Sequence, residues 1–328
     1  MAVDSTRDGG RPVVKAVFLD YDTVSAGDLD LTALRAAVGE LLLCDSDDAK
    51  TAERIHDADI VLLNKVELPR GLLQGASKLK LIAVAGTGTN NIDVAAAREL
   101  GIAVCNVRGY CTSSVVQHVW ALILSLTQHV SDYAQTARSG WIQNEALMVQ
   151  AHPIRELEGR IFGVVGWGDL GRGAARIAAG FGMQVLIANR CGASPQPDRL
   201  ELEQLLALAD IVSLHCPLND STRGLIGARE LALMKPDALL INTARGGLVD
   251  GRALAAALKA GRLGGAGIDV LPQEPPPAGE PLLDPGIPNL ILTPHVAWAA
   301  QEARQRCVDE MAANVREFLD GGRRSRVD

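Results

Sequence analysis

An apolar, strand-like run that leads directly into a G-x-G-x-x-G sequence and then into a helix limits the fold of this chain more than any other feature. The run ends at Val165, the glycines are Gly166, Gly168 and Gly171, and helix-forming residues follow at 174–180. Here Gly166 permits a tight turn, Gly168 lets the backbone approach a pyrophosphate, and Gly171 lets helix and strand pack closely. The helix N-terminus adds free N–H groups and a positive dipole. The sequence therefore predicts a dinucleotide-binding unit whose phosphate-binding residues are Gly166, Gly168, Asp169, Leu170 and Gly171.

The end of the next predicted strand, residues 184–188, bears on which dinucleotide binds. In NAD-binding proteins an acid about 20 residues beyond the first glycine accepts hydrogen bonds from the ribose. Here that position holds Asn189, and Arg190 follows it. Asn189 does not repel a 2′-phosphate, and the Arg190 guanidinium could pair with one. The sequence therefore favours NADP(H) and leaves NAD(H) open, with the alternative that Arg190 is only a surface charge.

Length and composition indicate a compact protein with more than one domain. A chain of 328 residues exceeds what one hydrophobic core usually holds, so about two domains are expected. Hydrophobic residues make up 48% and aromatic residues only 3%, so aliphatic packing must dominate the cores. The net charge of -7 gives no basic surface for nucleic acid, and we expect none to bind.

The rest of the sequence predicts a cytoplasmic protein with reduced cysteines and no bound metal. No run approaches the roughly 18 to 20 apolar residues of a membrane span, and residues 1–11 lack the apolar core of a signal peptide, so we expect a cytoplasmic protein that does not contact membranes. The six cysteines form no C-x-x-C pair and are expected to stay reduced. The six histidines are dispersed, so no metal site is expected.

Three chemically distinct side chains follow the last predicted strands. Arg245 comes after an apolar run at 238–241, Glu274 after one at 267–271, and His295 after one at 290–292. Loops at the carboxyl ends of strands are where an open α/β sheet binds its ligands. A guanidinium, a carboxylate and an imidazole together could reduce a ketone. Taken singly, each has a simpler interpretation as a surface charge, a solvated loop acid or a hydrogen-bonded structural histidine.

The N-terminal part predicts a separate small α/β lobe. Strands are expected at 13–19, 59–63 and 79–85, with helices between them. A long helix is expected from Thr112 to about Ala137, and its middle, residues 115–126, is apolar on nearly every side. Such a helix is expected to be buried all round, and a subunit interface would bury it.

With these motifs, the chain resembles the D-isomer-specific 2-hydroxyacid dehydrogenases, and within them the glycerate dehydrogenase or hydroxypyruvate reductase type. The likeness runs through nearly the whole chain. Besides the glycine sequence, it rests on VAGTGTNNID at 84–93, CNVRGY at 105–110, INTARGGLVD at 241–250, DVLPQEPP at 269–276 and TPHVAW at 293–298. Several motifs in the family's order are far more specific than any one alone.

The resemblance implies a fold of two doubly wound parallel-sheet α/β domains. A Rossmann cofactor domain, residues 107–292, would be inserted in a discontinuous flavodoxin-like substrate domain, residues 1–106 and 293–328. The active site would lie between them. The resemblance also implies a homodimer formed largely through the cofactor domains, which is consistent with the apolar helix after Thr112.

The resemblance also implies roles for named residues. His295 would act as general acid and base, Glu274 would favour its charged form and orient it, and Arg245 would bind the substrate carboxylate and carbonyl. The substrate's carboxyl end would bind at the Gly-containing turn of Thr87 and Gly88. Further cofactor contacts are implied for Cys216 and Pro217 on the adenine side, for Thr243 and Ala244 beside Arg245, and for Asp269 at the nicotinamide carboxamide. Lys65, which follows the predicted strand at 59–63, could add a positive charge to the substrate site, with the alternative that it is only a solvated lysine.

Three readings of function follow. The first is reduction of a small 2-keto acid such as hydroxypyruvate or glyoxylate to the D-2-hydroxy acid. The second is a non-catalytic nucleotide-sensing protein on the same fold, against which the intact Arg245, Glu274 and His295 argue. The third is a different substrate, such as phosphoglycerate; a phosphoglycerate dehydrogenase with a regulatory module is disfavoured because the chain ends shortly after His295.

The chain departs from the family pattern at Asn189 and at Asp169. The Asp169 carboxylate near a pyrophosphate is tolerable if it points to solvent.

Overall fold

The computed structural model describes residues 14–139, 141, 151–192 and 194–328. The chain forms two compact units, which we call the first unit (Met1–Cys111 with Ala299–Asp328) and the second unit (Thr112–Trp298). The predicted crossings at 106/107 and 292/293 lie a few residues before these boundaries.

The first unit is built on a five-stranded sheet in the order β2-β1-β3-β4-β5. All of its pairs are parallel, and the order is the flavodoxin-like one. The predicted strands at 13–19, 59–63 and 79–85 correspond to β1, β3 and β4. Residue 13 lies outside the described residues, and β3 ends at Leu63 as predicted, whereas the other predicted ends extend one or two residues beyond the strands. The strands are β1 Val14–Phe18, β2 Gly39–Leu43, β3 Ile60–Leu63, β4 Leu81–Val84 and β5 Ala103–Cys105.

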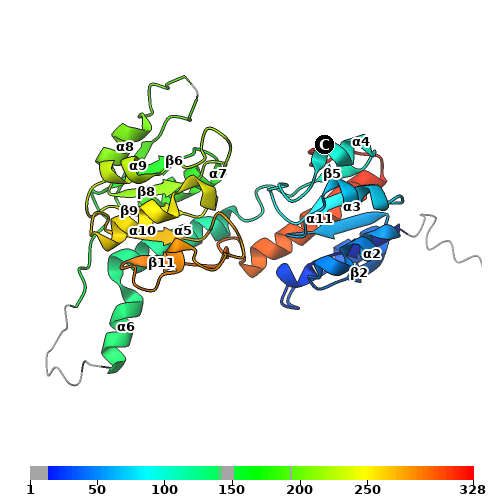
Figure 1. Ribbon diagram of the computed structural model, residues 1–328, viewed down its shortest axis with the longest axis horizontal. Coiled ribbons are helices and arrows are strands. Elements are labelled where there is room, and N and C mark those ends of the chain that lie inside the picture. The colour runs from blue at the N-terminus through cyan, green and yellow to red at the C-terminus, as the bar shows by residue number, and fades with distance from the viewer. Residues whose placement is uncertain (1–13, 140, 142–150, 193) are drawn as a thin grey trace, which may run out of the picture. The chain divides into compact units, whose positions relative to one another are not determined.

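Helices cover both faces of this sheet (Figure 1). Every residue of β3 is buried, and the period-2 alternation sends Val61 and Leu63 to the core under α2, α3 and α4. Ile60 and Leu62 point to the opposite face, where α1 and α11 pack against each other and α11 contacts β4. The helices are α1 Thr32–Val38, α2 Thr51–His56, α3 Arg70–Gly75, α4 Val94–Glu99 and α11 Gln301–Leu319, with the 3-10 turns η1 Tyr21–Thr23 and η2 Asp48–Lys50.

The second unit contains a six-stranded parallel sheet in the order β11-β10-β9-β8-β6-β7. The strand after β6 pairs on one side of it, and all later strands add on the other, so the topology switches at β6. Ligands of doubly wound sheets bind at such a switch point. The strands are β6 Ile161–Val165, β7 Gln184–Ile187, β8 Ile211–Leu214, β9 Leu239–Asn242, β10 Gly265–Ile268 and β11 Leu290–Leu292.

Two separate cores sandwich this second sheet. On β8, Val212 and Leu214 belong to the core under α8, α9 and α10, whereas Ile211 belongs to the core under α5 and α7. Two parallel, doubly wound sheets confirm the predicted fold class. The helices are α5 Thr112–Gln128, α6 Val130–Ser139, α7 Asp169–Gly180, α8 Leu202–Leu208, α9 Ala228–Leu233 and α10 Gly251–Lys259, with the 3-10 turns η4 Gly246–Leu248 and η5 Pro281–Leu283.

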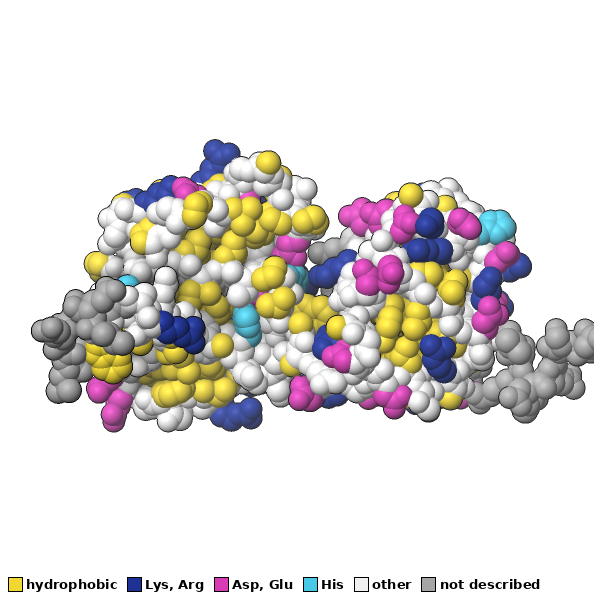
Figure 2. All heavy atoms as spheres, turned by 90° about the horizontal axis from the view of Figure 1, so that it is seen from below, with side chains coloured by type: hydrophobic (Ala, Val, Ile, Leu, Met, Phe, Trp, Pro, Cys, Tyr) yellow, Lys and Arg dark blue, Asp and Glu magenta, His cyan; other side chains and the backbone are white. Residues whose placement is uncertain are grey.

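The single long helix predicted for 112–137 is wrong, because the chain breaks it at His129. That residue has a φ of 50°, a left-handed conformation that ends α5, and α6 restarts at Val130. Burial all round is also wrong for the single chain: Val119 and Ile123 are fully buried, but Gln117 and Ala121 are exposed. Hydrophobic side chains gather on the side of this unit that carries α6 (Figure 2).

Among the described residues, no helix combines the length and the apolar character that crossing a membrane would require.

Candidate active site

Five strands of the second unit end at one edge and deliver the predicted site residues there. The parallel register aligns Val165 with Leu214 and aligns Ile268 with both Asn242 and Leu292. The residues that follow these positions therefore emerge side by side at the carboxyl edge of the sheet. They are Gly166, His215, Thr243, Asp269 and Thr293.

The turn after β6 has the geometry that its glycines predict. Gly166 has a φ of +106°, and a Cβ there would lie 2.5 Å from the backbone nitrogen of Cys216. At Gly171 a Cβ would lie 2.1 Å from the carbonyl oxygen of Gly166, whereas at Gly168 it would meet nothing within 4 Å. Gly166 and Gly171 thus occupy positions where no side chain would fit, whereas Gly168 lies beside open space.

The start of α7 presents free donors beside that open position. The helix begins at Asp169, and its first internal bond runs from the Arg172 N–H to the Gly168 carbonyl. Within the described chain, the N–H groups of Asp169, Leu170 and Gly171 donate no hydrogen bond. The Asp169 side chain is 71% exposed and pairs with Arg172 at 2.6 Å, so its charge points away from these donors. This arrangement suits a pyrophosphate, which is stabilised by helix N-terminal N–H groups.

The imidazole of His295 is held by the carboxylate of Glu274. Nδ1 of His295 lies 2.5 Å from Oε2 of Glu274, and Oε1 of Glu274 accepts a hydrogen bond from the Leu271 N–H at 2.9 Å. The carboxylate is thereby fixed to the turn after β10 while it orients the ring. Nε2 of His295 makes no hydrogen bond to any described residue. The pair leaves one ring nitrogen available for proton exchange.

A buried carboxylate anchors the loop that carries His295. The Asp269 side chain has no exposed surface; Oδ1 accepts bonds from Thr293 Oγ1 at 2.6 Å and from the Val296 N–H at 2.9 Å, and Oδ2 accepts one from the Ala297 N–H at 2.9 Å. His295 itself has a φ of 55°, and its N–H donates to the Asp269 carbonyl at 2.8 Å. This network over-determines an unfavourable backbone conformation, as is common at functional sites.

A histidine from α5 joins this network. Nε2 of His118 lies 3.1 Å from Thr293 Oγ1 and 3.5 Å from Asp269 Oδ1. Thr293 lies 175 positions after His118 in the sequence, and Asp269 lies about 150 positions after it.

Arg245 lies at the neighbouring strand end. The fully buried Asn242 shapes the turn: its Nδ2 donates to the Arg245 carbonyl at 2.9 Å, and its Oδ1 accepts from the Ala244 N–H at 3.0 Å. The guanidinium donates to the Ala244 carbonyl at 2.7 Å and forms no ion pair within the described chain. A Cβ at Gly246 would lie 2.0 Å from the carbonyl carbon of Leu271, so the Arg245 and Glu274 loops touch through backbone. The structure joins Glu274 to His295 directly and places Arg245 one strand away.

An acid at the start of α8, Glu201, contacts the position that was predicted to select the cofactor. Asn189 Nδ2 donates to Oε1 of Glu201 at 2.8 Å, and Asn189 Oδ1 accepts from the Gln196 N–H at 3.0 Å. The amide therefore holds the loop before α8. Arg190 is exposed and forms no ion pair with the described residues. One free guanidinium and one carboxylate thus flank the position predicted to select the cofactor.

The turn after β8 is neutral. Burial raises the pKa of the Cys216 thiol to about 11, so it stays protonated. Burial lowers the pKa of His215 to about 4, so its ring is uncharged at neutral pH, and its Nε2 lies 2.9 Å from Ser213 Oγ. The Pro217 carbonyl accepts a bond from Thr222 Oγ1 at 2.7 Å. Thr243 Oγ1 on the next strand end is buried and has no hydrogen-bond partner among the described residues.

The substrate-binding residues predicted in the first unit lie on two turns. Thr87 Oγ1 donates to the Val107 carbonyl at 2.9 Å, so its hydroxyl supports the turn, while the N–H groups of Gly88 and Thr89 donate to no described residue. Lys65 is exposed, and its N–H donates to Asp20 Oδ2 at 2.6 Å. Asp20, which the sequence did not single out, is fully buried and also binds the N–H groups on either side of Lys65.

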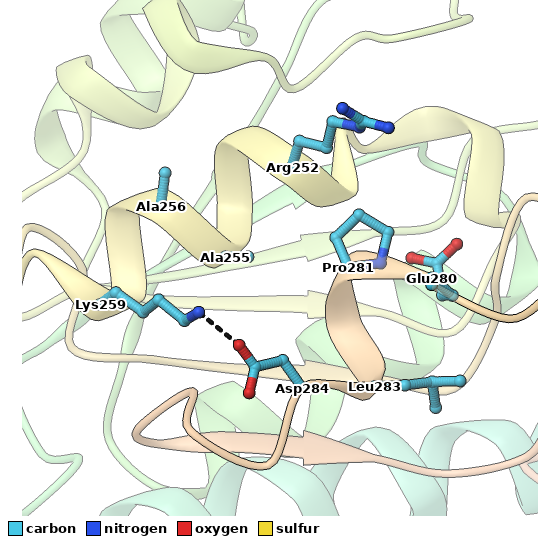
Figure 3. Close-up of a pocket in the computed structure, with 9 residues that line it drawn as sticks. Arg252, Ala255, Ala256, Lys259, Glu280, Pro281, Leu283 and Asp284 are labelled. Atoms are coloured by element: carbon cyan, nitrogen blue, oxygen red, sulfur yellow. Dashed lines mark hydrogen bonds and ion pairs between the residues drawn. The ribbon is translucent and has the colours of Figure 1, made fainter.

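A solvent-open pocket of about 610 Å³ lies elsewhere on the second unit, between α10 and η5 (Figure 3). Lys259 and Asp284 form an ion pair across it. None of the predicted site residues lines this pocket, and we assign it no role. Its lining residues are Arg252, Ala255, Ala256, Lys259, Gly279, Glu280, Pro281, Leu283 and Asp284.

Comparison with known proteins decides the family. Residues 120–297 match the model of the D-isomer specific 2-hydroxyacid dehydrogenase, NAD binding domain. The chain belongs to this family. The matched residues lie within the second unit. The chain is therefore an oxidoreductase that acts on the CH–OH group of D-2-hydroxy acids.

Individual members of the D-2-hydroxyacid dehydrogenase family resemble the chain over most of its length. It is 44% identical over 270 residues to a glycerate dehydrogenase from Methylorubrum extorquens, covering 82% of this chain and 85% of that one. It is 36% identical over 317 residues to a hydroxypyruvate reductase from Blautia hydrogenotrophica, covering 94% and 98%. A solved acyclic imino acid reductase (Bsp5) in complex with NADPH and D-Arg has a TM-score of 0.82 and 27% identity, covering 96% and 100%.

Proposed function

We propose that this dehydrogenase reduces hydroxypyruvate or glyoxylate to the D-2-hydroxy acid, with NADP(H) as its favoured cofactor. The observation that carries the proposal is the His295–Glu274 pair at the carboxyl edge of the sheet, one strand from Arg245 and on the same sheet as the open glycine turn. The names of the glycerate dehydrogenase and hydroxypyruvate reductase relatives support the substrate class.

The residues that would hold the cofactor follow from the turns described above. Gly166, Gly168 and the first turn of α7 would hold the pyrophosphate through Asp169, Leu170 and Gly171. Asn189 and Arg190 would meet the adenosine ribose, Cys216 and Pro217 the adenine, Thr243 and Ala244 the region beside Arg245, and Asp269 and His295 the nicotinamide end. When bound, the cofactor supplies the hydride to the carbonyl carbon. The neutral Cys216 thiol suits an uncharged adenine ring.

Chemistry at the carbonyl oxygen falls to the chain's own side chains. Nε2 of a protonated His295 donates a proton to that oxygen, and the neutral ring takes it back in the oxidative direction. Glu274 stabilises the imidazolium and fixes its orientation through Nδ1. Arg245 offers a fork of donors to the carboxylate and the carbonyl oxygen and so positions and polarises the substrate.

In the first unit, we assign the substrate's carboxyl end to the turn at Thr87 and Gly88. The unbonded N–H groups of Gly88 and Thr89 support this assignment, because successive free N–H groups form an anion-binding concavity. Thr87 contributes its backbone, since its hydroxyl already binds Val107. Lys65 adds a positive charge. The first unit would thus be the substrate domain.

We also propose a homodimer, with the exposed side of α5 at the contact. Gln117 and Ala121 are exposed on α5, and Val130 is 62% exposed at the start of α6. Contiguous exposed apolar surface marks association sites, and the hydrophobic side chains that gather on the side of the second unit carrying α6 support this contact (Figure 2). The cytoplasmic location stays a prediction from the sequence.

Steady-state kinetics test the substrate and the catalytic role together. We expect hydroxypyruvate and glyoxylate to give the highest kcat/KM in a panel of 2-keto acids, measured with NADPH and NADH by the loss of reduced-cofactor absorbance. Saturable cofactor binding without turnover of any acid in the panel would favour a nucleotide-sensing protein instead. A phosphorylated keto acid as the best substrate would contradict the proposed specificity.

The cofactor preference has its own test, which the structure sharpens. Asn189→Asp alone would place a second carboxylate against Glu201, 2.8 Å from the present amide nitrogen, and would disturb the loop. The double variant Asn189→Asp with Glu201→Gln keeps a hydrogen-bonded pair and adds the ribose acceptor. We expect its NADPH/NADH ratio of kcat/KM to fall by about tenfold or more, because the carboxylate at position 189 would repel a 2′-phosphate.

Glu201→Gln alone is the matched control for this double variant. It removes a carboxylate beside the proposed 2′-phosphate position and is expected to move the ratio the opposite way, toward NADPH. Equal ratios in the wild type and both variants would show that neither residue sets the preference, and Arg190→Ala would then measure the part played by the guanidinium.

A further inference from the structure

Two histidines and an aspartate converge where α5 meets α6, on the second unit and outside the residues assigned above. Nδ1 of His129 lies 3.1 Å from Oδ2 of Asp132, and the rings of His129 and His152 are 5.0 Å apart at an interplanar angle of 19°. One ligand-type atom from each residue lies within 4.8 Å of the others. From these three residues we infer a binding site for a Zn²⁺-class cation, with a fourth position left to water.

The distances suit one tetrahedral ion. Zn²⁺ binds imidazole nitrogen at about 2.0 to 2.1 Å, which places two ligand atoms roughly 3.3 Å apart and the centroids of two bound imidazoles roughly 5 Å apart. The His129–Asp132 separation of 3.1 Å and the ring separation of 5.0 Å lie near these values. The three ligand-type atoms lie within 4.8 Å of one another, so the side chains would draw together by up to about 1.5 Å around the ion. Two imidazoles and one carboxylate also favour Zn²⁺ and its neighbours over Mg²⁺ or Ca²⁺, which prefer oxygen.

Hydrogen bonds to the backbone of His152 and of nearby residues hold this segment beside α6, in addition to the ring contacts. Tyr133, the residue after Asp132, donates from its hydroxyl to the His152 carbonyl at 2.6 Å and accepts from the His152 N–H at 3.0 Å. The Arg155 N–H donates to the Thr127 carbonyl at 3.1 Å. His152, 20 positions after Asp132 in the sequence, is thereby fixed beside α6.

The conformation of His129 also points to a constrained site. Its φ of 50° is uncommon for a residue other than glycine, and such positions persist where surrounding contacts determine them. Its side chain is only 12% exposed, while that of Asp132 is 52% exposed. A cation would reach the site from the Asp132 side. The sequence predicted no metal, because a His-x-x-Asp pair and a distant histidine form no recognised ligand spacing.

Titration of the metal-free, full-length protein with Zn²⁺ at about pH 8, where imidazole lone pairs are free, tests the site. A competing chromophoric chelator reports the affinity, and elemental analysis after gel filtration reports the stoichiometry. We expect one Zn²⁺ per chain and no retention of Mg²⁺. His152→Gln and Asp132→Asn should each weaken binding by about tenfold or more, since even residues behind the ligands typically contribute that much.

His56→Gln is the control, because that histidine is exposed in the first unit and pairs with the neighbouring Asp57. Its Zn²⁺ affinity should equal that of the wild type. Cofactor binding by each variant confirms that the second unit is folded. Loss of Zn²⁺ binding with intact cofactor binding in His152→Gln supports the site. A stoichiometry far from one, equal Zn²⁺ affinity in His152→Gln and wild type, or equal retention of Mg²⁺ would overturn it and leave His129 and His152 as a stacked pair.

Discussion

His295→Ala is expected to lower kcat by about a hundredfold to ten-thousandfold while the dissociation constant of the reduced cofactor changes little. The imidazole is oriented by a carboxylate through the 2.5 Å contact between its Nδ1 and Glu274, and its Nε2 makes no hydrogen bond to a described residue. General acid–base catalysis of this kind typically contributes two to four orders of magnitude. Single-turnover rates with hydroxypyruvate and fluorescence titration with NADPH would measure the two effects separately.

Two further variants set the scale for His295→Ala. His56→Ala removes an exposed histidine of the first unit and should leave kcat unchanged. Glu274→Gln keeps a hydrogen-bonding group beside Nδ1 but removes the charge, so its kcat should fall less than that of His295→Ala. If His295→Ala keeps kcat within tenfold of the wild type, another group is the acid and the proposed mechanism is wrong.

Gly171→Ala is expected to destabilise the second unit strongly. The added Cβ would lie 2.1 Å from the Gly166 carbonyl oxygen and 3.0 Å from a Val164 methyl group, and backbone would have to move to make room. Overpacking of this severity should cost about 3 kcal/mol or more. For a unit of this size the Tm should drop by roughly 6 to 12 °C, measured by calorimetry without cofactor.

Gly168→Ala is the paired variant, because a Cβ there meets nothing within 4 Å. Its Tm without cofactor should stay close to that of the wild type, while its KM for the cofactor rises, since the methyl group lies on the side where the pyrophosphate would approach. A Gly168→Ala protein with unchanged cofactor KM would show that the phosphates do not bind at this position.

The sequence predicts the framework well because its signals are local. The glycine turn follows from residues adjacent in the chain, and its three glycines have distinct surroundings in the structure that match their expected roles. Strand positions in both units follow from short apolar runs. The break at His129 was missed because nothing in the apolar pattern around it marks a residue that takes a left-handed conformation.

What the sequence could not predict depends on contacts between distant segments. The Asp269 anchor joins residues 24 to 28 positions apart, and His118 reaches Thr293 across 175 positions. Asp269 was expected to bind the nicotinamide, and the structure shows its carboxylate already occupied by the His295 loop. The same holds for Asn189, whose amide was expected to face the ribose but also binds Glu201.

Arg245, Glu274, His295 and the glycine turn all belong to one uninterrupted stretch of the chain, Thr112–Trp298, whereas the turn proposed to grip the acid is encoded in another. In evolutionary terms, and under the proposed function, mutations in the flanking segments would change the surroundings of the bound acid without disturbing the proton-transfer pair. Substrate specificity could therefore change through substitutions in the flanking segments, at a low risk of losing catalysis. A family organised in this way is expected to diversify by the metabolite it consumes while its reaction stays constant.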